Sequence, residues 1–518
     1  MSLRHDQLTV GEIPYYFASK FDTKDKVAVK TNEGFELTFT QLNNRSNQVA
    51  RLMIEDFQLK QGDTVVTFLT NCGQYPEIIF GLAKAGIIIA PVSFRFVSRE
   101  LKYAIEHSDT KALILSEELW DIYREIEHEV QIPKDNVLII GNGAMANYES
   151  RIKKKDYKNF DVYVHENDNF WLGLTGGTTG APKAALTTHR SMIEHWKRVA
   201  IEFTMLPDDF LLISSPFYHG LGFLFGLQLL SVGGSLYITK TFNPKLILSI
   251  IEEEKITVTP VVPTMLSEIL NDSDKDNYDV SSLRVLICGG AALLTKLKED
   301  TLQFFPKCGL YTMYSSTEHG FYTLLKPKDQ LRKNRSSGLP FYGVNIKILD
   351  ENGNEVKQGE VGEVYKKGLL LGAEYYKNLE ETRKCFRGEW ASSGDMGYVD
   401  EEGFLYIVDR KKDMIISGGV NIYPTEIEEI ILTHPSVREV CVVGLPNEKW
   451  GEIVSAFIVG KDGSTFSSED ILRHCDGKMG NYKKPKYIRF INELPKNAAG
   501  KILRRSLKDI YADPNLIV

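Results

Sequence analysis

The chain has 518 residues, of which 43% are hydrophobic and 25% are charged, and 62 basic against 69 acidic side chains give a net charge of -7. This composition is that of an ordinary soluble globular protein and excludes a disordered or fibrous chain. The acidic excess argues against a general nucleic-acid or anionic-membrane surface, and the length predicts several domains or one large body with an appendage.

The amino-terminal stretch MSLRHDQLTVGE lacks the apolar run of a signal peptide. The longest apolar region, IIFGLAKAGIIIAPV, is interrupted by Lys84 and is too short to span a bilayer, so we expect a helix that turns into a buried strand. The cysteines show no C-x-x-C spacing, which predicts reduced thiols in the cytoplasm, without disulfides or zinc. They are Cys72, Cys288, Cys308, Cys385, Cys441 and Cys475.

Short apolar runs alternate with helical patterns along most of the chain: DTVVTFL, KALILS, NVLIIG, DFLLISS, ITVTPVV and LRVLICGG. Runs of this length, separated by helices, predict a largely parallel, covered sheet. Around residue 400 the sequence pattern changes to two short β-rich segments joined by DEEG. A predicted helix, PTEIEEIILTH, and a predicted strand, VREVCVVGL, follow. We therefore expect an α/β protein, with a large domain of mixed, mainly parallel sheets and helices (residues 1–408) and a small α+β domain (residues 409–518).

Thr175 to Lys183 read TGGTTGAPK. The glycines let the backbone turn its N–H groups inward, the threonines add hydroxyls and Lys183 adds a point charge, a combination that can enclose a polyphosphate. A flexible surface loop explains neither the strand-like NFWLGL before this stretch nor the lysine that closes it. The common P-loop, G-x-x-x-x-G-K-[ST], does not match, so a simple Walker ATPase is disfavoured.

Two later stretches place polar groups beside apolar ones. PFYHGLGF puts His219 at what we expect to be the buried end of an apolar strand, where a histidine is more often structural than functional. YSSTEHG offers Tyr314 as an aromatic face for a base, Thr317 as a hydroxyl and Glu318 as a carboxylate able to hold Mg²⁺. An isolated Thr-Glu pair would usually be structural.

These stretches occur in chain order with AGIIIAPVSFRFVSREL, SSGDMGYVDEEGFLYIVDRKKDMIISGGVNIYPTEIEE and LPKNAAGKILRRSLK. Together they resemble the signatures of the adenylate-forming superfamily, which includes acyl-CoA synthetases, peptide-synthetase adenylation domains and luciferases. The resemblance runs from about residue 10 to residue 512. One departure is Ser315, where the family usually has glycine, and we expect it to change the backbone freedom only slightly.

The resemblance implies an acid-thiol ligase, an AMP-forming acyl-CoA synthetase that uses ATP, Mg²⁺ and coenzyme A. By this resemblance, Asp395 accepts hydrogen bonds from both ribose hydroxyls and Arg410 supports the same sugar. The residues expected to bind ATP are Thr175, Gly176, Gly177, Thr179, Gly180, Tyr314, Thr317, Asp395 and Arg410. Those expected to be catalytic are Lys501, Glu318, Thr178 and Lys183, with Glu318 as the metal ligand.

The resemblance also implies two half-reactions on one carbonyl carbon. Lys501 first approaches the carboxylate and the α-phosphate, and a thiol later attacks the acyl-adenylate. We expect the small domain to be mobile and to rotate about Lys412, which would withdraw Lys501 and bring Gly418 and Gly419 to the acyl site, where these small residues would let a pantetheine arm pass.

The expected acyl pocket is bordered by His219 and by Gly289, Gly290 and Ala291. Amino-acid-activating relatives usually have a Phe-Asp pair where this chain has Phe217, Tyr218 and His219, so we favour a fatty or aryl acid. The chain ends soon after Lys501, without room for a fused carrier domain, which favours free coenzyme A over a separate carrier protein. A non-catalytic nucleotide-binding module is a further alternative. We expect a monomer or homodimer, with no nucleic-acid partner.

Overall fold

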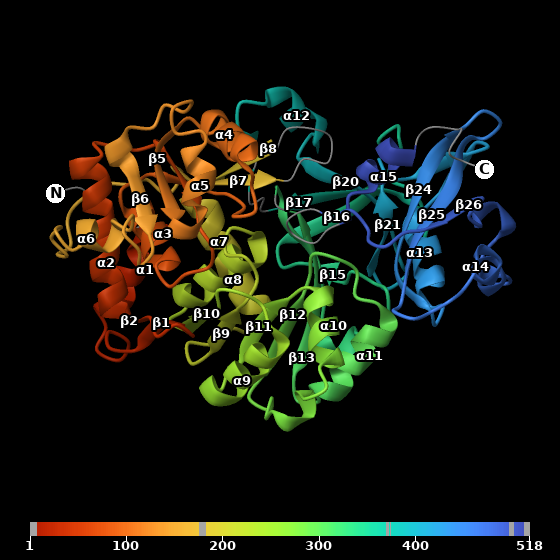
Figure 1. Cartoon of the computed structure of the whole chain (residues 1–518), viewed down its shortest axis with the longest axis horizontal. Helices are drawn as coiled ribbons and strands as arrows, with labels where there is room; N and C mark the ends of the chain where they lie inside the picture. The colour runs from red at the N-terminus through yellow and green to blue at the C-terminus, as the bar shows by residue number, and fades with distance from the viewer. Residues whose placement is uncertain are drawn as a thin grey trace. The chain divides into compact units, whose positions relative to one another are not determined.

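The computed structural model describes residues 8–175, 183–316, 318–368, 372, 374–496 and 502–511, with only the backbone described for Thr175 and Lys183. Their contacts group into two units (Figure 1). The first unit takes its described residues from 1–177, 181–345 and 367–389, and the second from 346–366 and 390–518. The domain boundary at residues 408 and 409, and the mobility of the small domain, stay predictions.

The first unit contains two sheets. The larger has the strand order β15-β14-β13-β12-β11-β9-β10-β1-β2 among the described residues, and neighbours are parallel from β13 to β1. The antiparallel strands lie at its two ends. Its strands are β15 (Leu339–Pro340), β14 (Gly320–Leu325), β13 (Gly309–Ser316), β12 (Val285–Cys288), β11 (Val258–Val261), β9 (Phe210–Ile213), β10 (Ser235–Ile238), β1 (Val27–Thr31) and β2 (Glu36–Thr38).

The second sheet of this unit has the order β18-β8-β7-β4-β3-β5-β6. Strands β7, β4, β3, β5 and β6 are parallel, and β8 and β18 continue the sheet antiparallel. The strands are β18 (Glu374–Tyr375), β8 (Lys183–Thr188), β7 (Asn169–Thr175), β4 (Ile88–Pro91), β3 (Thr64–Phe68), β5 (Thr110–Ser116) and β6 (Val137–Ile140).

Helices of the first unit pack against these sheets. Apolar side chains of α9 and α10, such as Ile251 and Leu266, share a core with Leu212 of β9 and Leu286 of β12, and Figure 1 shows both helices beside these strands. The helices are α1 (Ile13–Ala18), α2 (Phe39–Arg51), α3 (Tyr75–Lys84), α4 (Ser98–His107), α5 (Trp120–Arg124), α6 (Tyr148–Ile152), α7 (His189–Glu202), α8 (Gly220–Ser231), α9 (Pro244–Glu254), α10 (Pro263–Asn271), α11 (Thr295–Phe304) and α12 (Leu379–Lys384).

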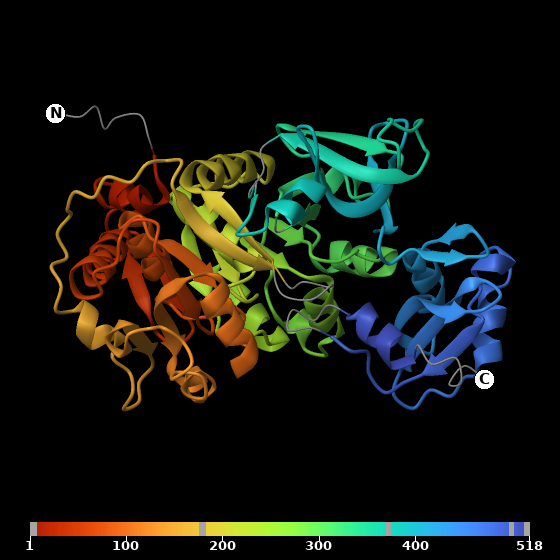
Figure 2. The same cartoon turned by 90° about the horizontal axis from the view of Figure 1, so that it is seen from above.

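Most strand pairs of the second unit are antiparallel. Strand β20 (Trp390–Val399) pairs with β17 (Gly362–Gly368) and with β21 (Leu405–Arg410). A second sheet, coloured blue in Figure 2, joins β22 (Ile415–Ser417), β23 (Val420–Ile422), β24 (Val437–Asn447), β25 (Gly451–Gly460) and β26 (Tyr487–Phe490). It is accompanied by α13 (Pro424–Leu432), α14 (Ser468–Cys475) and α15 (Arg504–Tyr511). Two short strands remain: β16 (Val344–Leu349), most of which belongs to the second unit, and β19 (Phe386–Arg387), which belongs to the first.

The predicted fold class is confirmed. Each of the six apolar runs contains one strand: β3, β5, β6, β9, β11 and β12 in chain order, all on parallel ladders. The long apolar region is helix α3 followed by β4, as expected. DEEG forms the turn between β20 and β21, where Asp400 N–H donates to Phe404 O at 3.0 Å. All six cysteines are free thiols.

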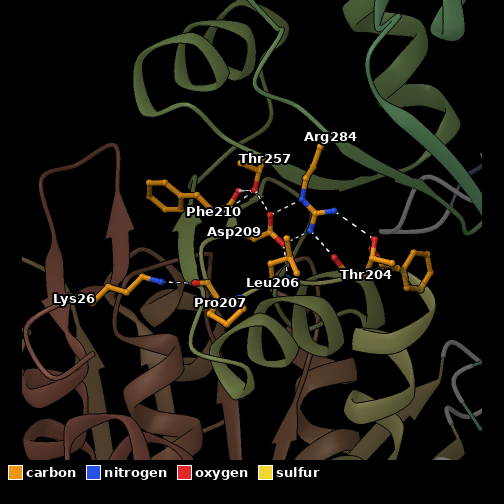
Figure 3. A network of polar contacts seen from close by, with 9 residues as sticks. Lys26, Thr204, Leu206, Pro207, Asp209, Phe210, Thr257 and Arg284 are labelled. Carbon is orange, nitrogen blue, oxygen red and sulfur yellow. Dashed lines mark hydrogen bonds and ion pairs between the residues drawn. The ribbon is translucent and has the colours of Figure 1, made fainter. Parts of the chain in front are cut away.

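A network of hydrogen bonds and an ion pair connects the residues before three strands at the amino-terminal edge of the larger sheet (Figure 3). Asp209, Thr257 and Arg284 stand directly before β9, β11 and β12. The Asp209 carboxylate, 3% exposed, accepts from Arg284 Nε at 2.7 Å, from Arg284 Nη2 and from Thr257 Oγ1 at 2.8 Å. Arg284 Nη2 also donates to Thr204 O at 2.7 Å. The opposite, carboxyl edge is where ligands bind in open α/β sheets.

Candidate active site

Three predicted site stretches follow the carboxyl ends of parallel strands in the larger sheet. The loop with His219 comes after β9, the Gly289–Ala291 stretch after β12 and Glu318 just after β13. Because parallel strands end at the same edge, the fold brings these stretches to one edge of the sheet. Sequence spacing alone could not establish this, since it depends on the strand order.

The position of His219 differs from the one expected. The sequence predicts a buried histidine at a strand end, but His219 is exposed and caps the amino terminus of α8. The strand ends six residues earlier, and the backbone has left the sheet by Pro216, whose carbonyl accepts from His219 N–H at 3.1 Å. The flanking Phe217 is fully buried, and its ring stacks on Tyr75 at 5.0 Å. The pocket role of His219 stays a prediction.

Asn71, which the sequence analysis did not single out, holds the His219 loop in place. Its Nδ2 donates to Ser215 O at 2.9 Å and to Thr239 O at 3.0 Å, while its Oδ1 accepts from Phe217 N–H at 2.7 Å. Asn71 follows β3 of the smaller sheet, whereas its partners follow β9 and β10 of the larger sheet. Its side chain therefore ties the carboxyl edges of both sheets together. A polar residue three positions after a buried strand was the available signal.

The Gly289–Ala291 stretch needs its glycines for space and for backbone shape. A Cβ atom on Gly289 would lie 2.5 Å from Cε and 2.9 Å from Cγ of Met313, so this side chain of β13 would have to move to admit one. Gly290 has a φ of +86°, in the region that glycine adopts without strain. Gly290 and Ala291 are exposed. Two of the three residues of this stretch expected to border the acyl pocket thus lie at the surface, and their role in the pocket stays a prediction.

The Glu318 segment lies beside a small pocket with about 190 Å³ of empty space. The Tyr375 hydroxyl donates to Glu318 Oε1 at 3.2 Å, and Tyr314 packs its ring against Tyr322 at 4.8 Å. Thr317 lies outside the described residues. Ser315 does not have a left-handed φ, so serine fits where the family usually has glycine. The pocket is lined by Ala185, Glu318, His319, Gly372, Glu374, Tyr375, Thr382, Cys385 and Phe386.

A single carboxylate at this position suits Mg²⁺. This ion is usually held by one or two carboxylates together with substrate phosphates and waters rather than by an all-protein cage. Glu318 is half-buried, and one of its oxygens is fixed by a hydrogen bond. In the described part of the chain, no three His, Cys, Asp or Glu side chains gather as a metal site. The donor set therefore fits an ion that reaches the protein with a polyphosphate.

The predicted phosphate loop is closed by a hairpin. Strands β7 and β8 are antiparallel, and Thr175 pairs in register with Lys183, so the chain between them leaves and re-enters the sheet at one point. Gly176, Gly177, Thr178, Thr179 and Gly180 lie outside the described residues, as does Lys501. The hairpin explains the strand-like stretch before the loop.

Asp395 and Arg410 lie side by side. They pair across β20 and β21, and Arg410 Nε lies 3.2 Å from Asp395 Oδ1. Ser393 Oγ donates to Asp395 Oδ2 at 2.7 Å. Asp395 is 5% exposed, and its carboxylate is held by these two contacts. The acceptor and the cation that the sequence predicts at a ribose therefore do form one cluster.

Lys412 and the glycine pair occupy turns of the second unit. Lys412 is exposed between β21 and β22, in a turn closed by Asp413 N–H donating to Arg410 O at 2.9 Å. Gly418 and Gly419 join β22 to β23, with Ser417 paired to Val420, and have φ values of +59° and +79°. Positive φ at both central residues is what a two-residue type I′ turn requires. Glycine is needed there for backbone geometry as well as for small size.

Every helix among the described residues is too short or too polar to span a bilayer.

Comparison with known proteins places these features in one family. A family model for an AMP-binding enzyme matches residues 18–376, and one for the AMP-binding enzyme C-terminal domain matches residues 426–501. The chain is 31% identical to a 2-succinylbenzoate–CoA ligase of Oceanobacillus iheyensis over 499 residues, which cover 95% of this chain and 98% of that protein.

Two further similarities concern the acceptor and the intermediate. The chain is 32% identical to the fatty acid–[acyl-carrier-protein] ligase ScoC of Streptomyces coeruleorubidus over 518 residues, covering 98% of each. It also resembles the solved o-succinylbenzoate CoA synthetase of Bacillus subtilis in complex with its acyl-adenylate intermediate, with a TM-score of 0.87, 26% identity and coverage of 98% of this chain and 99% of that one.

Proposed function

Because the chain belongs to the AMP-binding enzyme family, we propose that it is an acid-thiol ligase that activates a carboxylic acid with ATP and transfers the acyl group to coenzyme A. The first half-reaction gives an acyl-adenylate and pyrophosphate, and the second gives an acyl-CoA and AMP. The observation that carries this proposal is the match over nearly the whole chain to a CoA ligase, combined with the motif residues that the sequence retains.

The first half-reaction joins two anions, and this chain supplies groups that offset their repulsion. At 4 Å and an effective dielectric near 20, each pair of like charges costs about 4 kcal/mol. Glu318 would hold Mg²⁺, which when bound neutralises phosphate charge. Lys183 and Lys501 would add cationic side chains, and the glycine-threonine loop would add amides and hydroxyls, including the hydroxyl of the candidate catalytic residue Thr178. Asp395 and Arg410 would hold the ribose.

The second half-reaction needs a different group at the same carbonyl carbon. Rotation of residues 409–518 about Lys412 would withdraw Lys501 and bring the glycine turn at residues 418 and 419 to the acyl site. The exposed turn that carries Lys412 supports this assignment, because a hinge must change its backbone angles without breaking a core. Lys412→Pro should impair thioester formation much more than adenylate formation. Equal losses in both half-reactions would contradict the hinge.

The acid is a fatty or aryl acid. His219 and the glycines after β12 border its pocket, and no aspartate stands in the Phe217 to His219 stretch to hold a substrate ammonium group. The printed activities of the relatives, on 2-succinylbenzoate and on fatty acids, agree with this class. Coenzyme A is the leading acceptor, and the similarity to ScoC keeps a separate carrier protein as the second candidate.

The remaining proposals concern the cellular compartment and the oligomeric state of the enzyme. Six free thiols suit a reducing compartment, for which we propose the cytoplasm, and the enzyme acts as a monomer or homodimer.

Pyrophosphate and AMP release tests the proposal directly. The purified full chain is incubated with ATP, Mg²⁺, coenzyme A and acids from C2 to C18 or with an aromatic ring. We expect release that depends on one of these acids, and a thioester with coenzyme A in higher yield than with a carrier protein. If no acid elicits AMP, the chain is a nucleotide-binding module and not a ligase.

A further inference from the structure

The segment from Gly372 to Tyr376 is bonded to the Glu318 region through both its backbone and a side chain. Gly372 N–H donates to Glu318 O at 2.8 Å, and the Tyr375 hydroxyl donates to Glu318 Oε1 at 3.2 Å. A Cβ atom on Gly372 would lie 3.1 to 3.2 Å from Ala185, Leu186 and Glu318, so the backbone approaches closely. The segment therefore touches Glu318 at two points.

Two residues of this segment form β18 (Glu374–Tyr375), the edge strand that pairs with β8. Tyr375 of β18 pairs with Ala185 of β8, and Tyr376 N–H donates to Ala184 O at 2.7 Å. Strand β8 begins at Lys183, the last residue of the predicted phosphate loop. Tyr375 thus has its backbone on the strand that leaves this loop and its hydroxyl on the predicted magnesium ligand.

The chemistry of the Tyr375 hydroxyl suits this place. The Tyr375 hydroxyl carries a proton that it can donate, and an ionised carboxylate such as Glu318 can only accept. The Tyr375 side chain is largely buried, and the Cys385 thiol also interacts with its hydroxyl. A donor held in this way fixes the plane of the Glu318 carboxylate and leaves Oε2 as the oxygen for a cation.

We propose that Tyr375 is a positioning residue for the adenylation reaction, which orients the Glu318 carboxylate toward a cation carried by ATP and couples that orientation to the strand leaving the phosphate loop. The proposal rests on the ligase function above. Hydrogen bonds to a carboxylate that ligates a metal are typically worth about 10- to 100-fold in metal affinity or activity. Tyr375→Phe should therefore weaken cation binding by about tenfold while preserving the ring.

The adjacent residue offers a matched control. The Tyr376 hydroxyl donates to Asp109 Oδ2 at 2.8 Å instead of to Glu318. Tyr376→Phe removes a hydroxyl group from the same segment and leaves the hydrogen bond to the Glu318 carboxylate in place. Any effect common to both variants would report the stability of the segment, whereas an effect confined to Tyr375→Phe reports the orientation of Glu318.

The test measures Mn²⁺ binding to the full chain by electron paramagnetic resonance, in the presence of an ATP analogue with a methylene group between the α- and β-phosphates. We expect the Mn²⁺ Kd to rise about tenfold in Tyr375→Phe and to stay at the wild-type value in Tyr376→Phe. Unchanged Mn²⁺ affinity in Tyr375→Phe, or equal weakening in both variants, would overturn the proposal.

A kinetic readout covers the case in which Tyr375→Phe is less stable. If Tyr375→Phe only misorients the Glu318 carboxylate, the Mg²⁺ concentration that gives half the maximal rate of pyrophosphate exchange should rise about tenfold. The variant should then reach the wild-type rate at saturating Mg²⁺. A rate that stays low at every Mg²⁺ concentration indicates structural damage and contradicts the positioning role. An inactive wild-type protein would instead contradict the ligase function, which keeps the two failures distinct.

Discussion

Replacing Asn71 by alanine should destabilise the first unit and disturb the His219 loop. The substitution removes three hydrogen bonds at a residue that is 4% exposed: two to the carbonyls of Ser215 and Thr239 and one from Phe217 N–H. A buried backbone group that loses its partner costs about 1 to 3 kcal/mol. The space left by the side chain can admit a water molecule, so we take the lower end, about 1 kcal/mol for each backbone group. The three groups together predict a loss of about 3 kcal/mol in the free energy of unfolding.

Urea unfolding followed by intrinsic fluorescence measures this change, with Asn277→Ala as the control. Asn277 is exposed, so its substitution should alter the free energy of unfolding by less than about 0.5 kcal/mol. Since Phe217 lies two residues before His219, Asn71→Ala should also raise the KM for the acid more than the KM for ATP. A loss of stability below about 1 kcal/mol, or equal changes in both KM values, would refute the reasoning.

Three further predictions concern acid stability, the amino-terminal edge of the sheet and catalysis. Burial lowers the pKa of His189 to about 4 from 6.5, so the stability that its neutral form contributes is present above pH 6.5 and is lost as the pH falls toward 4, by up to about 3 kcal/mol. The urea concentration at the unfolding midpoint should therefore fall more steeply between about pH 7 and 4.5 in the wild type than in His189→Gln, and equal slopes would contradict this. Arg284→Ala should lower the free energy of unfolding by about 2 kcal/mol, because it leaves the buried Asp209 carboxylate without its partly exposed cation. Lys245→Ala, at an exposed ion pair, should have a much smaller effect, and similar unfolding free energies for the two variants would argue against the network. Lys501→Ala should slow adenylation by about 10² to 10³ and leave thiol transfer from supplied acyl-adenylate intact, and normal pyrophosphate exchange would contradict its role.

Local chemistry made much of the fold predictable. Strands such as β5 and β12 are covered on both faces, so each reads as a continuous apolar run without alternation. The tight turn at Gly418 and Gly419 was not predicted, although two adjacent glycines favour the consecutive positive φ values found there. The error at His219 has a local cause as well: its apolar neighbours, Phe217 and Leu221, are buried, but the histidine stands at a helix cap and points out of their packing.

Contacts between distant parts of the chain could not be predicted in this way. Tyr375 and Glu318 are 57 residues apart, and they meet because the two-residue strand β18 adds to the edge of β8. A strand this short has no periodicity to detect. Asn71 raises the same difficulty, since its partners are more than 140 positions away and are all backbone groups, which leave no trace in the residue types. The family signature predicts that Asp395 and Arg410 contact the same ribose, but only the register of the hairpin formed by β20 and β21 shows that the two residues are paired.

The separation of the two edges of the larger sheet has a consequence for how this enzyme could diversify. The ion pair of Asp209 and Arg284 anchors one edge, while the loops that would choose the acid emerge from the other. Replacements in those loops can therefore accumulate without loosening the anchor. A library confined to the exposed positions His219, Ala291 and Ala292 should yield variants with altered acid preference and nearly parental melting temperatures, which makes these positions the natural starting point for redesign.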